Sequence, residues 1–364
     1  MNTQKHIAFI IYSLDSGGAE RVVTTLANHF IKSYNVSIIT IINKPSFYTL
    51  DNKVDIEYCA EDVQRSKGLI NALKNNLRLM RKIKGHLKKQ NVDIALSFMT
   101  TSNVMNVLAT RALKIPCIIS ERSNPYIYTH NSFWNKLIKY TYPKANYLVV
   151  QSKLIEDYYN KFVDVSKISI LPNPISKKLS SSKTISEKRK NVILNVGRLD
   201  SNKAQDLLIR AFANIEHSDW KLTFVGDGQL LNQYRDLVEE LKITQSVSFT
   251  GNVSNVEDYY NESSIFALTS KSEGFPNALI EAMYFELACI STDCPTGPSE
   301  VIEDSKNGFL IAINNQKQLE NKLKQFMDSE ALRISFGKEA YVKAKSFEIN
   351  IVANQWNELI SKLL

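Results

Sequence analysis

Short runs of apolar, mostly β-branched residues alternate with longer amphipathic stretches along the whole chain. Continuous short runs predict buried strands, and apolar residues that recur every three or four positions predict helices. In the first half, strands are predicted over residues 6–14, 35–42, 93–98, 117–120 and 147–151, with a helix over 19–30. Such alternation favours a parallel sheet that helices cover on both faces.

The alternation begins again after a polar stretch rich in lysine and serine, residues 176–190, which is predicted to be a linker or an exposed loop. The second series has predicted strands over residues 191–196, 221–225, 246–250, 265–268 and 288–292, and helices over 206–215, 230–241, 277–285, 317–326 and 349–364. The chain therefore predicts two doubly wound α/β domains in tandem. Ligands of such sheets bind beyond the carboxyl ends of the strands, so we expect a ligand cleft where two sets of strand ends face each other.

The most specific polar pattern is a pair of glutamates in the second half. Glu273 precedes Gly274, Phe275 and Pro276, and these lead into a helix that carries Glu281. The N–H groups of a helix N-terminus attract a phosphate or an electron-rich sugar. Glu281 could accept two hydroxyl hydrogens, as a ribose diol supplies. The alternative is a helix with an acidic surface face.

Two further patterns follow the neighbouring predicted strands. Gly197 lets the chain turn sharply, and Arg198 and Lys203 then lie at the sheet edge, where two cations can hold a diphosphate. Charge-assisted hydrogen bonds of this kind contribute roughly 1.5–3 kcal/mol each. The alternative is a basic surface turn. Gly226 and Gly228 form a G-x-G at the same edge, a spacing that also marks ordinary tight turns.

In the first half, Ser16, Gly17 and Gly18 join the first strand to the first helix. This loop matches neither G-x-G-x-x-G nor a P-loop, which argues against a dinucleotide or P-loop site. Adjacent glycines still allow a phosphate or an acceptor sugar to approach the helix N-terminus. The alternative is a flexible turn between strand and helix.

Charge is divided unevenly between the two halves. Residues 1–170 hold 23 Lys and Arg against 12 Asp and Glu, or +11, while residues 171–364 hold 22 against 25, or −3. A lopsided charge suggests that the first half faces an anionic partner, such as nucleic acid, anionic lipid or a phosphate-bearing acceptor. The predicted helix over 69–89 is basic and free of acids. It fits either a helix that lies on anionic lipid or a core helix with a solvated basic back.

Cysteine, histidine and hydropathy patterns narrow the function classes further. The four cysteines form no C-x-x-C pair, and the five histidines are scattered, so no metal site is expected. The apolar run near the start is about eight residues long, too short to span a bilayer. We therefore expect a cytoplasmic protein.

Taken together, the motifs resemble those of the family-4 retaining glycosyltransferases of the GT-B fold, over nearly the whole chain. The segments that carry the resemblance are Gly17-Gly18-Ala19-Glu20-Arg21, Gly197-Arg198 with Lys203, Gly226-Asp227-Gly228, Glu273 with Glu281, and Thr296-Gly297-Pro298-Ser299-Glu300 with Asn307-Gly308. The chain looks especially similar to bacterial enzymes that extend lipid-linked surface glycans, including N-acetylgalactosamine transferases.

The resemblance implies a division of labour between domains. Residues 1–172 would bind the acceptor, residues 173–345 the nucleotide sugar, and the helix within 346–364 would cross back to the first domain. The donor would be a nucleotide-diphosphate sugar, with uridine as the default base and GalNAc, Gal, GlcNAc or Glc as the sugar. The acceptor would be a lipid-linked glycan of polysaccharide, O-antigen, capsule or glycoprotein-glycan assembly. No cofactor or metal would be needed, and no nucleic acid would bind.

The resemblance also assigns roles to residues. Arg198 and Lys203 would hold the diphosphate, Glu281 the ribose and Glu273 the donor sugar; Arg198, Lys203 and Glu273 would be catalytic. The full predicted donor set is Gly17, Gly18, Gly197, Arg198, Lys203, Gly226, Gly228, Gly274, Phe275, Pro276, Asn277, Ala278, Leu279 and Glu281. Ser16, Glu121 and Arg122 are predicted at the acceptor. Arg122 stands where family members often have histidine, which puts a histidine contact to the sugar in doubt.

No side chain is clearly placed as a covalent nucleophile, so attack on the same face as the departing diphosphate is the favoured mechanism. The enzyme would work at the inner face of the cell membrane through its basic first domain. Two alternatives stay open: a sugar-nucleotide epimerase of the same architecture, and a sugar-nucleotide sensor without activity. An epimerase would need acid–base groups in the cleft, where Glu121 and His130 are the candidates.

Overall fold

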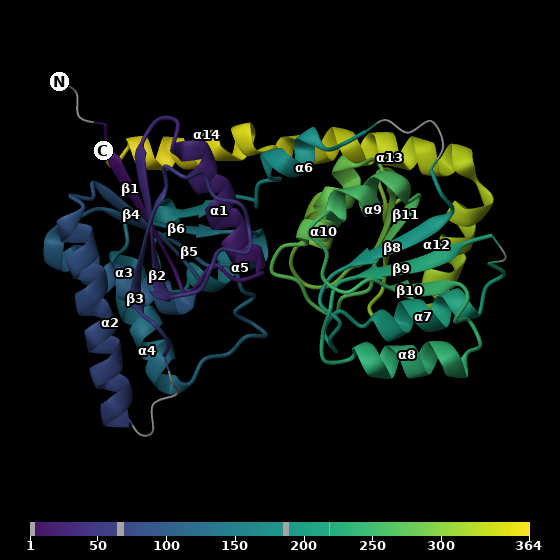
Figure 1. Ribbon diagram of the computed structural model, residues 1–364, viewed down its shortest axis with the longest axis horizontal. Helices are drawn as coiled ribbons and strands as arrows, with labels where there is room; N and C mark the ends of the chain where they lie inside the picture. The colour runs from purple at the N-terminus through teal and green to yellow at the C-terminus, as the bar shows by residue number, and fades with distance from the viewer. Residues whose placement is uncertain (1–3, 64–68, 185–188, 218) are drawn as a thin grey trace. The chain divides into compact units, whose positions relative to one another are not determined.

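A computed structural model describes residues 4–63, 69–184, 189–217 and 219–364 of the chain (Figure 1). The chain forms two compact units. Unit 1 comprises Met1–Pro174 and Ile349–Leu364, and unit 2 comprises Ile175–Glu348. Each unit is a parallel sheet with helices on both faces, which confirms the predicted fold class.

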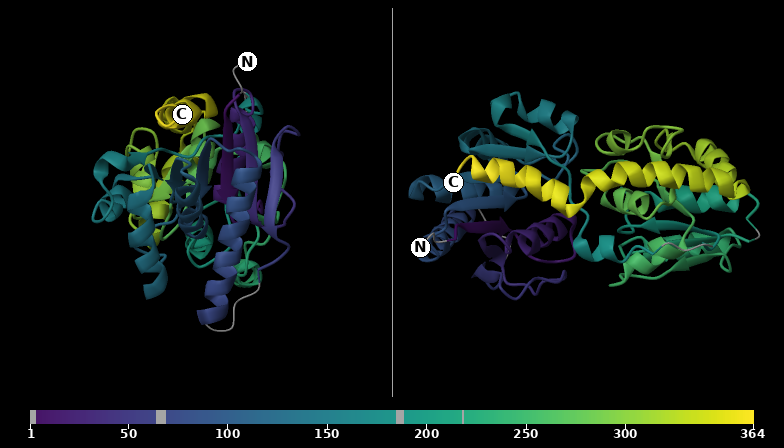
Figure 2. Two further views of the ribbon diagram at one scale, coloured as in Figure 1. Left: turned by 90° about the vertical axis from the view of Figure 1, so that its left-hand side faces the viewer. Right: turned by 90° about the horizontal axis from the view of Figure 1, so that it is seen from above.

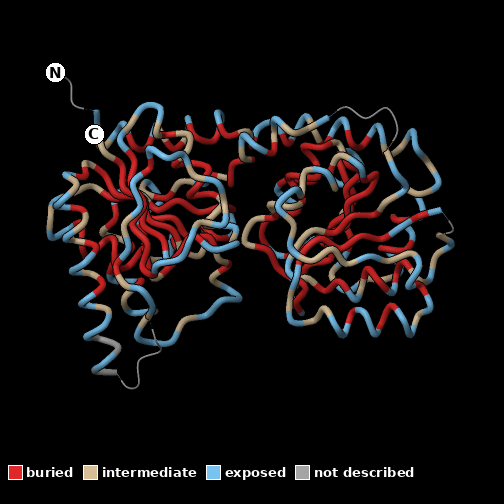
Figure 3. Tube along the Cα trace, in the orientation of Figure 1, coloured by how far each residue is buried: buried red, intermediate tan, exposed pale blue. Residues whose placement is uncertain are grey.

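Unit 1 is built on a seven-stranded sheet with the order β3-β2-β1-β4-β5-β6-β7. Its strands are β1 (His6–Ile11), β2 (Asn35–Ile42), β3 (Asp55–Ala60), β4 (Ile94–Phe98), β5 (Cys117–Ser120), β6 (Tyr147–Val150) and β7 (Ile168–Ile170). The order reverses at β1, which pairs in parallel with β2 on one side and with β4 on the other. Most residues of β1, β2, β4, β5 and β6 are buried, and the tube in Figure 3 shows buried residues at the centre of the unit.

Helices cover both faces of this sheet. One face carries α1 (Gly18–Phe30) and α14 (Ile349–Ser361), which pack against each other and around the fully buried Trp356. The other face carries α2 (Leu69–Lys89), α3 (Thr100–Leu113), α4 (Ser132–Thr141) and α5 (Lys153–Tyr159). The last helix therefore belongs to unit 1 although it follows unit 2 in the sequence.

Unit 2 is built on a six-stranded parallel sheet with the order β10-β9-β8-β11-β12-β13. Its strands are β8 (Val192–Val196), β9 (Lys221–Val225), β10 (Val247–Phe249), β11 (Ile265–Leu268), β12 (Ala288–Thr292) and β13 (Phe309–Ile311). Its helices are α6 (Lys177–Ser181), α7 (Gln205–Ala213), α8 (Leu231–Glu240), α9 (Val256–Glu262), α10 (Asn277–Tyr284), α11 (Pro298–Val301), α12 (Gln316–Asp328) and α13 (Glu330–Ala344). Because β8 and β11 are neighbours, the loops that follow them lie side by side.

The sequence predicted that residues 176–190 form a linker or an exposed loop, but part of this segment is a helix. Residues 177–181 form α6, because the Ser176 hydroxyl caps the helix by accepting a hydrogen bond from the Leu179 N–H. Leu179 is buried in the core of unit 2, which holds this helix in place. Residues 185–188 of the segment lie outside the described part of the chain.

Candidate functional site

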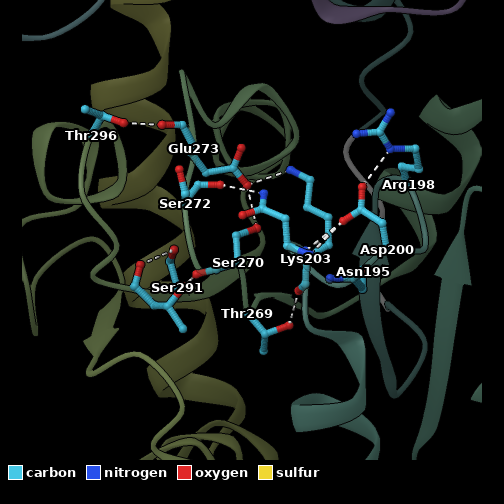
Figure 4. Close-up of polar contacts among 12 residues, drawn as sticks. Asn195, Arg198, Asp200, Lys203, Thr269, Ser270, Ser272, Glu273, Ser291 and Thr296 are labelled. Atoms are coloured by element: carbon cyan, nitrogen blue, oxygen red, sulfur yellow. Dashed lines mark hydrogen bonds and ion pairs between the residues drawn. The ribbon is translucent and has the colours of Figure 1, made fainter. Parts of the chain in front are cut away.

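The loops after β8 and β11 bring two of the predicted catalytic residues together at the carboxyl edge of the unit 2 sheet. The Lys203 Nζ atom lies 2.6 Å from Oε1 of Glu273 (Figure 4). The two side chains stand 70 positions apart in the sequence and meet because their strands are neighbours. A cation and a carboxylate are thus paired where sheets of this kind bind their ligands.

Glu273 is held from several directions. The Ser270 hydroxyl donates to Oε1 of Glu273 at 2.5 Å, and the Thr296 hydroxyl donates to its carbonyl oxygen. The side chain is only 8 % exposed. The rest of the loop is tied to Asn202, whose amide donates to the Ser272 carbonyl at 2.9 Å and whose carbonyl accepts from the Lys271 N–H at 2.7 Å. The carboxylate is therefore fixed by hydrogen bonds before any ligand binds.

Asp200 connects the two predicted diphosphate-binding cations, and sequence reasoning assigned it no role. Its Oδ1 accepts the backbone N–H groups of Asn202 and Lys203, both at 3.0 Å, and its Oδ2 accepts from Arg198 Nε at 2.7 Å. Burial of this carboxyl disfavours its charge, but these hydrogen bonds and the nearby guanidinium outweigh burial, so the pKa of Asp200 lies below its usual value. Asp200 thereby orients Arg198 and the turn that carries Lys203.

Arg198 differs from the buried groups around it, because its side chain is 74 % exposed. Only Nε is engaged by Asp200, and both are drawn in Figure 4. The rest of the guanidinium faces solvent. An exposed guanidinium whose base is fixed can bind an anion in a defined orientation.

Glu281 lies inside α10 and is almost completely buried. The Tyr260 hydroxyl, on α9, donates to Oε2 of Glu281 at 3.0 Å. Pro276 is the N-cap residue of α10 and not part of its first turn. Of the predicted donor residues near this helix start, Gly274, Phe275, Asn277 and Ala278 are partly exposed, whereas Pro276 and Leu279 are buried.

Gly226 and Gly228, two of the predicted donor residues, allow a close approach between two backbone turns. A Cβ atom on Gly226 would lie 2.1 Å from the Gly197 carbonyl oxygen, and one on Gly228 would lie 2.2 Å from the Leu199 carbonyl oxygen. Gly226 also has φ = +135°, a conformation that other residues rarely adopt. These glycines let the turns after β8 and β9 lie against each other, whatever they bind. Gly297, with φ = +107°, similarly allows its turn to contact Pro276.

The predicted unit 1 residues near α1 lie at the start of that helix. Ser16 is exposed, Gly17 is the N-cap residue and Gly18 begins α1. A Cβ atom on Gly17 would lie 1.9 Å from Oε2 of Glu20, so this carboxylate folds back over the helix start. Burial raises the pKa of Glu20. The N-terminus of α1 is thus faced by the chain's own carboxylate.

Glu121 and Arg122, the other predicted acceptor residues, lie in the interior of unit 1. Glu121 is 1 % exposed; its Oε2 accepts from Tyr142 Oη at 2.7 Å and Thr100 Oγ1 at 2.9 Å, and its Oε1 accepts from Ser123 Oγ at 2.8 Å. The Arg122 guanidinium donates to Asn173 Oδ1 and lies near the rings of Phe98 and Trp356. Burial lowers the pKa of Arg122 to about 9. Both side chains organise the segment after β5.

The described residues hold neither a metal-binding cluster nor a membrane-spanning helix. No group of three or more His, Cys, Asp and Glu side chains there is arranged to hold a metal ion. Nor is any helix in the described ranges both long and apolar enough to cross a bilayer. The four cysteines are buried and form no disulfide, and burial raises the pKa of Cys59 and of Cys294 to about 12.

Family models match both parts of the chain. The family described as Glycosyl transferases group 1 matches residues 176–343, and the family described as Glycosyltransferase Family 4 matches residues 16–178. The GalNAc-α-(1→4)-GalNAc-α-(1→3)-diNAcBac-PP-undecaprenol α-1,4-N-acetyl-D-galactosaminyltransferase of Campylobacter jejuni is 32 % identical over 98 % of this chain and 98 % of its own length. A second enzyme of that organism, N-acetylgalactosamine-N,N'-diacetylbacillosaminyl-diphospho-undecaprenol 4-α-N-acetylgalactosaminyltransferase, is 30 % identical over 94 % of this chain and 95 % of its own.

Solved structures share the fold at low sequence identity. Anabaena HepE in complex with UDP and glucose is similar with a TM-score of 0.82 at 16 % identity, covering 98 % of this chain and 99 % of that chain. Sucrose-phosphate synthase from Thermosynechococcus elongatus is similar with a TM-score of 0.83 at 16 % identity, covering 99 % of both chains. The paired cation and carboxylate at the unit 2 sheet edge, the family models and these relatives agree: the chain belongs to the group 1, family-4 glycosyltransferases, which have the GT-B fold.

Proposed function

We propose that this glycosyltransferase transfers a hexose or N-acetylhexosamine (GalNAc, Gal, GlcNAc or Glc) from a UDP-sugar to a lipid-linked glycan, with retention of anomeric configuration and without a metal. The observation that carries the proposal is the Lys203–Glu273 pair, which places a cation and a fixed carboxylate within 2.6 Å at the expected donor site. The UDP complex of HepE and the diphospho-undecaprenol substrates in the names of the Campylobacter relatives support the donor and acceptor classes.

The arrangement suits the departure of a nucleotide diphosphate. Negative charge grows on the leaving diphosphate, and Lys203 with the exposed Arg198 guanidinium would supply positive charge there, in place of a metal ion. Asp200 would keep the Arg198 guanidinium and the turn that carries Lys203 in place, while Glu273 holds the Lys203 ammonium. Cations that are oriented in advance need little rearrangement as the charge develops.

The surroundings of Glu273 support attack on the same face as the leaving group. Its Oε1 already accepts hydrogen bonds from Lys203 and Ser270. Because the Lys203 ammonium balances its charge, the Glu273 carboxylate is a poor nucleophile. Glu273 would instead bind hydroxyl groups of the donor sugar. The acceptor hydroxyl's proton would pass to the departing diphosphate as the new glycosidic bond forms.

Glu281 is proposed to bind the ribose diol, and the variant Glu281→Gln tests this. It keeps the shape of the side chain but removes a charge-assisted hydrogen bond, so affinity for UDP should fall about tenfold, equivalent to about 1.4 kcal/mol. Calorimetric titration with UDP measures the change. Tyr260→Phe is the matched control, because it removes the hydroxyl that donates to Glu281 without removing the charge. Unchanged UDP affinity in Glu281→Gln would assign this carboxylate to packing within α10.

The acceptor end is proposed to work at the inner face of the cell membrane. In α2, Leu79, Ile83 and Leu87 are buried against the sheet, so this helix is both a core helix and a carrier of basic side chains. Most of its described cationic side chains are exposed, including Lys74, Arg78, Arg81, Lys82, Lys88 and Lys89. A lipid diphosphate presents its phosphates at the same surface that such cations would contact.

Neutralising Arg81, Lys82, Lys84 and Lys88 together with glutamine is expected to release the protein from anionic vesicles at low salt. Each cation near an anionic bilayer contributes about 1 kcal/mol, and salt screens the attraction. Sedimentation with phosphatidylglycerol vesicles measures binding, and turnover should fall far more with a lipid-linked acceptor than with a water-soluble one. The matched control neutralises four lysines of unit 2, at positions 306, 317, 322 and 324. Vesicle binding that survives in the α2 variant would show that α2 is a solvated face.

Deleting the gene tests the proposed pathway step in the cell. The lipid-linked acceptor should then accumulate, because it is made but not extended. It should lack one sugar compared with the next intermediate of the wild type. Mass spectrometry of these lipids gives the mass of the missing residue and so distinguishes a hexose from an N-acetylhexosamine. An unchanged set of lipid-linked intermediates would contradict the proposal.

A further inference from the structure

Exposed large hydrophobic side chains gather in unit 1. Among the described residues, 17 large hydrophobic side chains are exposed, and only Ile334 and Val342 of these belong to unit 2. Unit 1 also carries the positive charge of the chain. Scattered single exposed hydrophobics are normal, but a cluster of them marks a contact surface.

Five of the unit 1 side chains lie close together in sequence, on the segment after β5 and on α4. Tyr126, Ile127 and Tyr128 are consecutive, and Phe133 and Tyr140 follow on α4; their exposed fractions range from 47 % to 61 %. Phe133, Lys136 and Tyr140 are spaced i, i+3 and i+7, so they share one face of the helix. We call the set of Tyr126, Ile127, Tyr128, Phe133, Lys136 and Tyr140 the α4 surface.

Within the described part of the chain, none of the side chains of the α4 surface belongs to the buried core cluster beneath α4, and only Tyr126 among its aromatic rings packs edge-on against a residue that contacts this core, Tyr158. The α4 helix packs inward through Ile138, with Trp134 and Leu137 beside it. The apolar residues of α4 form one wide stripe, and Phe133 and Tyr140 are its exposed edge, which the core leaves uncovered. The exposed edge of this stripe, Phe133 and Tyr140, is therefore available to contact a partner outside the chain.

The α4 surface is held in a fixed shape by the buried groups beneath it. Glu121 anchors the start of the segment through its bonds to Thr100, Ser123 and Tyr142. The Asn124 side chain accepts from the Tyr126 N–H, and its carbonyl accepts from the Tyr128 N–H. The exposed side chains thus stand on an ordered turn, which reduces the entropy lost on binding.

The positive charge of residues 122–155 and of α2 favours an anionic partner. Residues 122–155 contain five Lys and Arg and no Asp or Glu, and residues 63–92, which include α2, contain nine and none. Figures 1 and 2 show α2 and α4 extending past the unit 1 sheet in the same direction. Lysines interspersed with tyrosine, phenylalanine and isoleucine match the interfacial zone of an anionic bilayer, where aromatic rings sit among charged headgroups.

We propose that the α4 surface inserts its aromatic and aliphatic side chains into the headgroup region of an anionic phospholipid bilayer, beside the electrostatic contact made by α2. The inference rests on the proposed membrane location. It adds an apolar component that salt does not screen, on residues that the sequence analysis did not select. The two components together explain how a chain in which no described helix could span the bilayer would be held at its surface.

The test replaces Ile127, Tyr128 and Phe133 together with serine and leaves Tyr126 in place, because Tyr126 packs against Tyr158. Partitioning onto mixed phosphatidylglycerol and phosphatidylethanolamine vesicles is measured by sedimentation over a range of salt concentrations. We expect the partition coefficient to fall at least about tenfold at every salt concentration, since the variant buries less apolar area. The slope of its logarithm against the logarithm of salt concentration should stay the same, because no charge is changed.

The matched control is Ile334→Ser with Val342→Ser, which removes comparably exposed side chains from unit 2 and should leave partitioning unchanged. The neutralised α2 variant should instead flatten the salt dependence. Equal partitioning of the serine variant and the wild type would overturn the proposal, as would a wild type that does not bind the vesicles. A serine variant that binds vesicles normally but loses turnover on a water-soluble acceptor would reassign the surface to sugar binding and also overturn it.

The same proteins are assayed for release of UDP with a water-soluble acceptor, and this activity should be equal in the serine variant and the wild type. If the wild type shows no acceptor-dependent release, the proposed transferase reaction is wrong. The vesicle result then still decides whether the α4 surface binds lipid. The two claims therefore fail on different measurements.

Discussion

Replacing Lys203 or Arg198 with alanine is expected to slow turnover by about 10²–10³-fold, a loss of roughly 2.7–4 kcal/mol of transition-state stabilisation. Asp200 holds the Arg198 guanidinium and Glu273 holds the Lys203 ammonium, and the charge of both cations matters most as the leaving group becomes negative. Single-turnover kinetics with saturating donor and acceptor measures the effect on the chemical step. The effect on donor affinity should be smaller than the effect on turnover.

Lys271→Ala is the matched control for the Lys203→Ala and Arg198→Ala variants. Lys271 is an exposed lysine of the same sheet edge, and its backbone N–H, which an alanine keeps, donates to the Asn202 carbonyl. Its turnover should stay close to that of the wild type. Thermal unfolding shows whether Lys203→Ala, which leaves the buried Glu273 without its cation, remains folded. Near-normal turnover in Lys203→Ala or Arg198→Ala, with the variant folded, would exclude the replaced residue from the diphosphate site.

Glu273→Gln is expected to reduce turnover by about 10²-fold while changing UDP affinity little. The carboxylate lies at the proposed sugar end, and its pairing with Lys203 positions that cation for the diphosphate. Steady-state rates with the intact UDP-sugar and titration with UDP alone separate the two effects. In Glu281→Gln, by contrast, UDP affinity should fall about tenfold. This difference between the two variants would show that the two carboxylates have different roles.

The matched control for this variant is Glu262→Gln, which breaks the exposed ion pair with Lys190 on another part of unit 2. Exposed pairs contribute little, so its turnover and stability should be nearly unchanged. Should Glu273→Gln lose UDP affinity as strongly as turnover, the carboxylate would act on the nucleotide and the sugar assignment would have to be abandoned.

The buried strands of both sheets were predictable, whereas several sheet edges were not. The predicted ranges 35–42, 117–120, 221–225, 265–268 and 288–292 match β2, β5, β9, β11 and β12 residue for residue. These strands are apolar because helices cover both of their faces. The strand β3 was missed because it is an edge strand in which only one of six residues is buried, and β7 because it is only three residues long.

The site was partly predictable for a similar reason. Lys203 and Glu273 follow neighbouring strands, so the parallel topology alone brings them to one edge, and the structure pairs them. Asp200 was missed because its role depends on a turn in which one carboxylate accepts two backbone N–H groups and a guanidinium. The interior placement of Glu121 and Arg122 depends on packing against Tyr142, Phe98 and Trp356, which lie far away in the sequence.

Release of UDP from a UDP-sugar, measured with and without a lipid-linked glycan acceptor, distinguishes a transferase from an epimerase and from a sensor. Nuclear magnetic resonance of the product gives the configuration of the new bond. We expect that UDP is released only when acceptor is present and that the product keeps the α-configuration of the donor. An enzyme that changes the free nucleotide sugar without acceptor, as an epimerase would, or a product of inverted configuration would contradict this expectation.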